Sequence, residues 1–231
     1  MKSTFDIDAL KPYAANIDIV HDYERISSIP DSWKEILNHA KNGKPDMVAS
    51  YWKKIIPELS GVYEYFKDNL IDIQLVSVEK GEYKNYSLIY CLWSKDKDEV
   101  LYYEARNPAA SLINDSLRPY IDYLPENLLS FYSFHDGWRE VVTMAMGLEP
   151  LSEIHPLSDD DWGILDELEN INIDLSRAFS FFSDATGDYL CIEFKPSEDH
   201  DSAHIWSAHN KPRENVNFWG YLDAWTVIGF E

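Results

Sequence analysis

The feature that most constrains the fold of this 231-residue chain is a change in the spacing of its apolar residues near its first third. In the earlier part, apolar residues recur every three or four positions, which predicts helices over 30–43 and 46–66. In the later part, stretches rich in β-branched and aromatic residues alternate with short charged segments. These stretches, at 71–78, 83–93 and 100–104, predict a three-stranded antiparallel meander.

The second half of the chain mixes the same two patterns, so we expect an α+β protein whose mixed or antiparallel sheet is flanked by helices. Pro57 should interrupt the second helix, because proline lacks the backbone N–H that a helix interior needs. The patterns predict a helix over 124–135, a strand over 151–154, a helix over 158–169, a hairpin of strands 178–183 and 189–194, a strand over 203–207 and a final helix from Glu214.

Charge is distributed unevenly along the chain, whose formal net charge is −21. Residues 1–115 carry 14 basic and 19 acidic side chains, whereas residues 116–231 carry 6 and 22, for net charges of −5 and −16. From Glu140 to Ser176 there are 10 acidic residues and no Lys or Arg. Such a surface repels phosphate backbones and anionic lipids, which argues against nucleic-acid and membrane partners. It favours a basic protein partner, although solubility alone would also explain it.

The charge change and the proline-containing connection over 107–122 suggest a boundary near residue 115. We therefore predict an N-terminal α+β module over 1–115 and a second domain over 116–231. The alternative is that residues 1–115 are an integral part of the fold of the second half.

The chain lacks the sequence signatures of secretion and of common cofactors. Its opening has no apolar stretch like that of a signal peptide, and Cys91 and Cys191 each lie in an apolar, strand-like run. A reducing cytoplasm is therefore the expected location. His200, His204 and His209 suggest a metal site, but residues four apart on a strand lie roughly 13 Å from each other. We predict neither a metal nor another cofactor, and no catalytic residues.

Three segments of the second half, taken in order, resemble the SUKH superfamily, which includes bacterial toxin-immunity proteins and a yeast cell-wall regulator. The first runs from Leu124 to the His135-Asp136-Gly137-Trp138 segment, and the second is the Gly-Asp turn with its strand, Thr186–Phe194. The third is Ile205-Trp206 followed by the aromatic stretch Phe218–Trp225. The resemblance covers about residues 116–231 and implies a SUKH-like fold that binds a protein and has no catalytic constellation.

Resemblance and charge together predict a non-enzymatic immunity protein that binds and neutralises a cognate, plausibly basic and nuclease-type, bacterial toxin. Acidic side chains would stand in for the phosphates of a nucleic acid. Two alternatives stay open: a regulatory or scaffold protein of the same fold without a toxin partner, and a carbohydrate-binding or carbohydrate-active protein. The predicted contact residues are Asp159, Asp160, Asp161, Asp166, Glu167 and Glu169, with Glu198, Asp199 and Asp201 as a second patch.

Overall fold

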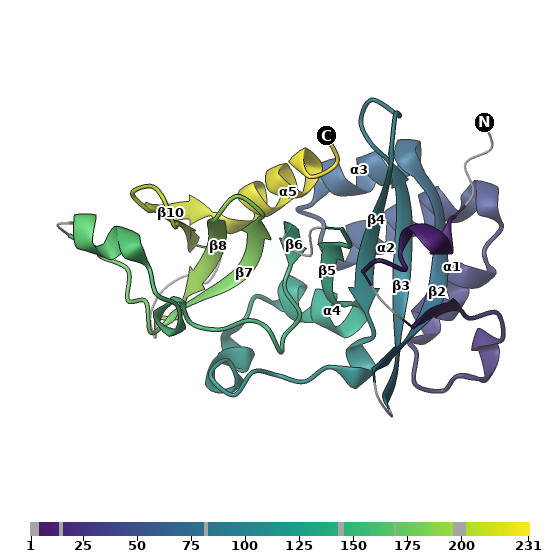
Figure 1. The fold of residues 1–231 in the computed structure, drawn as a ribbon, viewed down its shortest axis with the longest axis horizontal. Coiled ribbons are helices and arrows are strands. Elements are labelled where there is room, and N and C mark those ends of the chain that lie inside the picture. The colour runs from purple at the N-terminus through teal and green to yellow at the C-terminus, as the bar shows by residue number, and fades with distance from the viewer. Residues whose placement is uncertain (1–4, 14–15, 81–82, 143–145, 169, 196–201) are drawn as a thin grey trace.

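The strands of the computed structural model form one antiparallel sheet in which strand order follows chain order (Figure 1). The structure describes residues 5–13, 16–80, 83–142, 146–168, 170–195 and 202–231. Across these residues the ten strands are β1 (Ile17–Ile19), β2 (Leu70–Lys80), β3 (Tyr83–Trp93), β4 (Val100–Arg106), β5 (Asp136–Glu140), β6 (Met146–Leu148), β7 (Ala178–Asp184), β8 (Asp188–Glu193), β9 (Ser202–Ser207) and β10 (Arg213–Asn217).

Five α-helices are described, and none is long and apolar enough to cross a membrane. They are α1 (Asp31–Asn38), α2 (Lys44–Ile55), α3 (Ser60–Asn69), α4 (Glu126–Phe134) and α5 (Phe218–Ile228). Short 3-10 turns occur at Ile7–Ala9, Tyr23–Arg25, Lys41–Gly43, Pro108–Ala110, Arg118–Tyr123, Leu157–Asp159 and Gly163–Glu167.

The main core lies between one face of the sheet, here called the first face, and all five α-helices (Figure 1). Strand register explains its extent, because one row of buried side chains runs across eight strands, from β2 to β9. The row consists of Leu75, Leu88, Ala105, Trp138, Leu148, Phe182, Leu190 and Ile205. Burying this continuous apolar row against the helices is the main force that holds the sheet together.

The opposite face of the sheet, here called the second face, is apolar at its two ends and polar in the middle. Residues 5–13 cover an apolar cluster on β2–β4, where Leu10 packs near Val76 and Ile89. At the other end, residues 157–168 and 170–175 cover a second apolar cluster that includes Cys191 and Trp206. The strands between these clusters place Glu104 opposite Arg139 in register, so the middle of the second face is polar.

Much of the predicted secondary structure is confirmed. The meander corresponds to β2, β3 and β4, and the hairpin over 178–194 corresponds to β7 and β8. The second predicted helix is interrupted at Pro57, between α2 and α3. Gly137 has a positive φ of +80° and lies in β5, just after α4.

Two predicted elements are wrong, and the predicted start of the final helix is misplaced. Where a helix over 158–169 was predicted, residues 158–168 contain two 3-10 turns, Leu157–Asp159 and Gly163–Glu167, and Trp162 between them has an extended backbone. Consecutive aspartates and a glycine favour turns over a helix interior, which accounts for the difference. Residues 151–153 form a turn, and the strand of this region is β6.

The final helix begins at Phe218 rather than at Glu214. The Asn217 side chain accepts a hydrogen bond from the Gly220 N–H, which makes Asn217 the N-cap of α5. Asparagine is among the most favourable N-cap residues, so the start of α5 is set locally. Residues 213–217 instead pair with β9 as the edge strand β10.

The sheet is continuous across residue 115, because β4 pairs with β5. The main core is shared in the same way: Trp33, Trp52 and Phe66 from the first half pack in one cluster with Phe131 and Trp138 from the second. Residues 5–106 and 117–230 therefore contribute to one sheet and one core.

Candidate functional site

Five of the nine predicted contact residues lie in one loop, which is described over residues 157–168 and 170–175 and which we call the acidic loop. Asp159, Asp160 and Asp161 are consecutive and exposed. Asp166 and Glu167 are also exposed and lie in the second 3-10 turn. The other four predicted residues, Glu169, Glu198, Asp199 and Asp201, lie outside the described residues. The structure therefore places five of the six residues of the first predicted set in one loop, and it describes neither Glu169 nor the second patch.

The acidic loop is held against the sheet by apolar anchors. Trp162 is 8% exposed and packs edge-to-face against Trp206, with ring centroids 5.6 Å apart. Its indole N–H donates to the Leu157 carbonyl at 2.6 Å. Leu157 and Ile173 are also buried in this cluster. Exposed acids thus alternate with buried anchors, so the loop presents its charge on a fixed backbone.

His155 connects the acidic loop with the polar middle of the second face. Its Nδ1 lies 2.7 Å from the Glu153 carbonyl and its Nε2 lies 2.9 Å from an Asp160 carboxylate oxygen. Partial burial opposes protonation, but these hydrogen bonds and the nearby aspartates raise the pKa of His155 above its ordinary value. The protonated form consequently pairs with Asp160.

An ion-pair network occupies the polar middle of the second face, and we call it the carboxylate–arginine network. Arg139 contacts Glu149 and Glu153 through Nη1, both at 2.7 Å. Arg106 contacts Glu153 at 2.6 Å and Glu104 at 3.7 Å. Arg139 and Glu149 are 9% and 15% exposed, so this pair is mostly shielded from solvent, whereas Arg106 and Glu153 are 33% and 41% exposed.

The pKa values of the two glutamates on Arg139 shift in opposite directions. Burial raises the pKa of Glu149, and Arg139 only partly offsets it. Burial also opposes ionisation of Glu153, but Arg106 and Arg139 together hold its pKa below the ordinary value. Glu153 is therefore the carboxylate that both guanidiniums stabilise.

A groove of about 600 Å³ lies beside this network, between it and the N-terminal segment. We call it the second-face groove. Its lining combines apolar residues with polar ones, as small-molecule and side-chain sites do. The apolar part includes Leu10, Ile17, Val78, Ile89 and Val141, and the polar part includes Asn85, Ser87, Glu104, Arg106, Asn107, Asp136 and Glu153.

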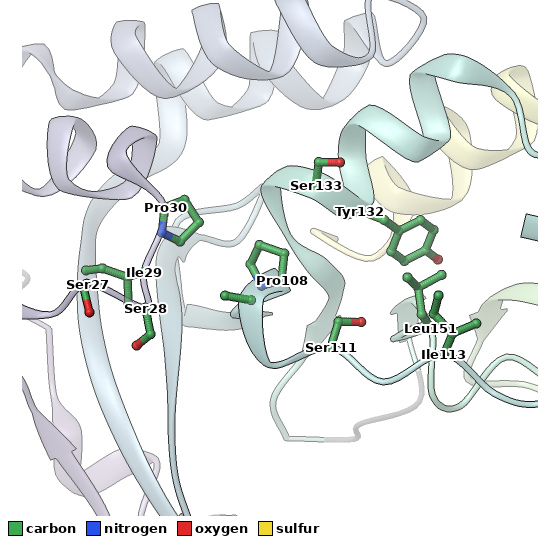
Figure 2. A pocket seen from close by; sticks show the side chains of 11 residues that line it. Ser27, Ser28, Ile29, Pro30, Pro108, Ser111, Ile113, Tyr132, Ser133 and Leu151 are labelled. Atoms are coloured by element: carbon green, nitrogen blue, oxygen red, sulfur yellow. The ribbon is translucent and has the colours of Figure 1, made fainter. Parts of the chain in front are cut away.

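A second hollow, of about 550 Å³, lies between the 27–30 segment, residues 108–113 and α4 (Figure 2). Figure 2 shows Pro30, Pro108 and Tyr132 around it, with the hydroxyls of Ser28 and Ser111. None of its lining side chains is charged. This hollow is therefore a weaker candidate for binding a charged partner than the second-face groove.

The His135-Asp136-Gly137-Trp138 segment, on which part of the family resemblance rests, is buried in the protein. His135 is fully buried, and burial lowers its pKa far enough to keep the ring neutral near pH 7. Its Nε2 lies 2.6 Å from the Tyr90 hydroxyl, which also accepts a hydrogen bond from Trp52. Asp136 accepts a hydrogen bond from the Leu151 N–H. The contact of His135 with Tyr90 joins the two halves of the chain inside the core.

The histidines considered for metal binding do not converge among the described residues, and His200 lies outside them. His204 contacts Glu193 through Nε2 at 3.1 Å and accepts from the Asn215 N–H at 3.4 Å. Both ring nitrogens are thus engaged within the protein. No group of three potential metal ligands occurs in the described part of the chain.

Both cysteine thiols are expected to be unreactive in the folded protein. Cys91 and Cys191 are buried and free, and burial raises the pKa of Cys91 to about 12. At pH 8 its thiolate fraction is roughly a thousandfold below that of a free cysteine, whose pKa is about 8.5. Titration with a chromogenic disulfide should therefore detect two thiols in denaturant and almost none in the native state. Rapid reaction of either native thiol would show that its side chain is accessible.

No family model, curated protein or solved structure matches this chain.

The sequence could not reveal the carboxylate–arginine network, because its members come from β4, β5 and the segment after β6. The only local signal was the spacing of Glu104 and Arg106, two apart in a strand and therefore on one face. The register of β4 with β5 determines which strand lies beside these residues and brings Arg139 next to Glu104. The sequence alone does not give this register.

Proposed function

We propose that this chain is a non-enzymatic immunity protein of SUKH type, which binds and neutralises a basic, nuclease-type bacterial toxin through its acidic loop. The observation that carries the proposal is the anchoring of this loop: buried Leu157, Trp162 and Ile173 fix a backbone that presents exposed acids. A loop already ordered before binding loses less conformational entropy when the partner arrives.

Charge supports the same function. The stretch from Glu140 to Ser176 contains no Lys or Arg, so no basic side chain of the loop itself neutralises its aspartates. A concentrated negative field accelerates encounter with a basic protein and positions it, mostly through the association rate. A nuclease that recognises phosphates would carry such a complementary basic surface.

The experiment co-expresses the chain with the protein encoded by the adjacent gene and measures growth of the host. We expect that protein to stop growth and the wild-type chain to restore it. Asp159→Lys/Asp160→Lys/Asp161→Lys should lower the association rate constant by about tenfold or more at low salt, with a smaller effect at high salt. Stopped-flow measurements with the purified toxin would give this rate.

A matched control changes three exposed acids elsewhere, Asp46→Lys/Asp68→Lys/Asp96→Lys, with the same total charge difference. The control should retain rescue and most of the association rate. Equal losses in both variants would show that only net charge matters and would reject the acidic loop as the contact surface. A harmless neighbouring protein, or toxicity that the wild-type chain leaves unrelieved, would refute the proposed function.

A further inference from the structure

We propose that the second-face groove receives a basic side chain, an arginine or a lysine, of the partner protein. This inference rests on the proposed function, because it takes the partner to be basic. It names a second contact point that the acidic loop does not supply.

The charges that line the groove select for a cation. Three carboxylates, Glu104, Asp136 and Glu153, line it together with one guanidinium, that of Arg106. Arg106 already contacts Glu104 and Glu153, so it is not available as a binding site for an anion. Glu153 also contacts Arg139 beside the groove, and Arg139 in turn contacts Glu149. The network and Asp136 thus place four carboxylates against two guanidiniums, so the site has more negative than positive charge, and the low-dielectric walls of a groove strengthen its field.

The apolar part of the groove selects for the shape of the cation. Ile17, Val78 and Ile89 provide an aliphatic surface next to these carboxylates. Arginine and lysine match this arrangement, since each has an aliphatic stem and a charged head. The volume of about 600 Å³ is large enough for such a side chain together with neighbouring partner atoms.

The groove and the acidic loop lie on the same face of the sheet. Strand register places Glu104, Arg139 and Tyr189 in one row across the second face, and Trp162 of the acidic loop packs against Tyr189. His155 bonds Asp160 of the loop and the backbone of Glu153 at the groove. One basic partner can thus contact the loop and insert a side chain into the groove.

The test uses the isolated full chain and Nα-acetyl-arginine amide as the probe, with NMR chemical shifts as the readout. We expect weak binding, with a Kd of about 1–10 mM, which is typical of a fragment this small. Shift changes should centre on Ser87, Ile89 and Asn107. The neutral isostere Nα-acetyl-citrulline amide should bind about tenfold more weakly, because it lacks the charge.

Two variants distinguish binding of the probe in the groove from its general attraction to the acidic surface of the protein. Glu104→Gln should weaken binding of the arginine probe by about tenfold, whereas Glu64→Gln, at an exposed position on α3, should leave it unchanged. Because Glu104→Gln could alter packing, Ser152→Trp at the rim offers a second variant that fills the groove and keeps its charges. Equal binding of citrulline, or shift changes confined to other surfaces, would overturn the inference. The co-expression experiment would still decide the proposed function.

Discussion

Replacing Trp52 by alanine is expected to lower the free energy of unfolding by about 3–5 kcal/mol, the usual cost of deleting a large buried aromatic side chain. Trp52 is 2% exposed, and its ring packs against Phe66 and Tyr90 from the first half of the chain. It also packs against Phe131 and Trp138 from the second. Its indole N–H donates to Tyr90, so the truncation also removes a buried hydrogen bond.

Chemical denaturation measured by both fluorescence and circular dichroism would test this expectation. Because Trp52 contacts both halves, the two signals should shift to lower denaturant together, in a single transition. Trp225→Ala is the matched control: Trp225 is only partly buried and packs against Phe182 and Tyr221, so its loss should cost clearly less. Two separate transitions, with only one of them shifted, would contradict the shared core.

The elements that sequence predicted well are those in which local pattern and tertiary packing agree. In β3, residues 88–92 are all apolar, which predicts a strand buried on both faces. Every second residue from Leu88 to Leu92 faces the main core, and the two between them face the cluster on the second face. In α2 and α3, proline chemistry at Pro57 is local and sufficient to place the break. The helix predicted over 158–169 was wrong because its signals disagree. Trp162 and Leu165 have helical spacing, but the neighbouring aspartates and glycine favour turns, and both apolar side chains pack against the sheet.

The sequence could predict only those parts of the candidate site whose residues lie close together in one segment of the chain. Asp159, Asp160 and Asp161 are adjacent in sequence, so their grouping needed no tertiary information. The second-face groove needed the packing of residues 5–13 against β2–β4 and the turn that carries Glu153, and neither contact has a sequence signature. The buried pairing of His135 with Tyr90 was equally invisible, because 45 residues separate them.

Replacing Arg139 by alanine is expected to destabilise the protein by about 2–3 kcal/mol at pH 7. Removal of one partner of a fully buried ion pair typically costs about 3–5 kcal/mol, because the remaining charge is left without compensation. We expect less here because Glu153 is 41% exposed and keeps Arg106 as a second partner. The main cost should come from Glu149, whose carboxylate is 15% exposed and loses its contact with Arg139.

The stability lost on replacing Arg139 should decrease as the pH falls. Burial already raises the pKa of Glu149, and removal of Arg139 would raise it further, so the folded variant loses stability as pH rises through that pKa. For Glu153, whose folded pKa is lowered in the wild type, the stabilisation is present above the unfolded pKa and is lost as pH falls. Both effects make the difference in unfolding free energy between wild type and variant largest near neutrality and smaller below about pH 4.3, the ordinary pKa of glutamate.

Urea denaturation of wild type and Arg139→Ala from pH 4 to pH 8 would measure this difference. The double variant Arg139→Ala/Glu149→Gln provides the control, since it removes the orphaned carboxylate and should recover part of the stability at pH 7. A deficit that stays constant with pH, unaffected by Glu149→Gln, would mean that Arg139 contributes through the packing of its aliphatic stem instead of its charge.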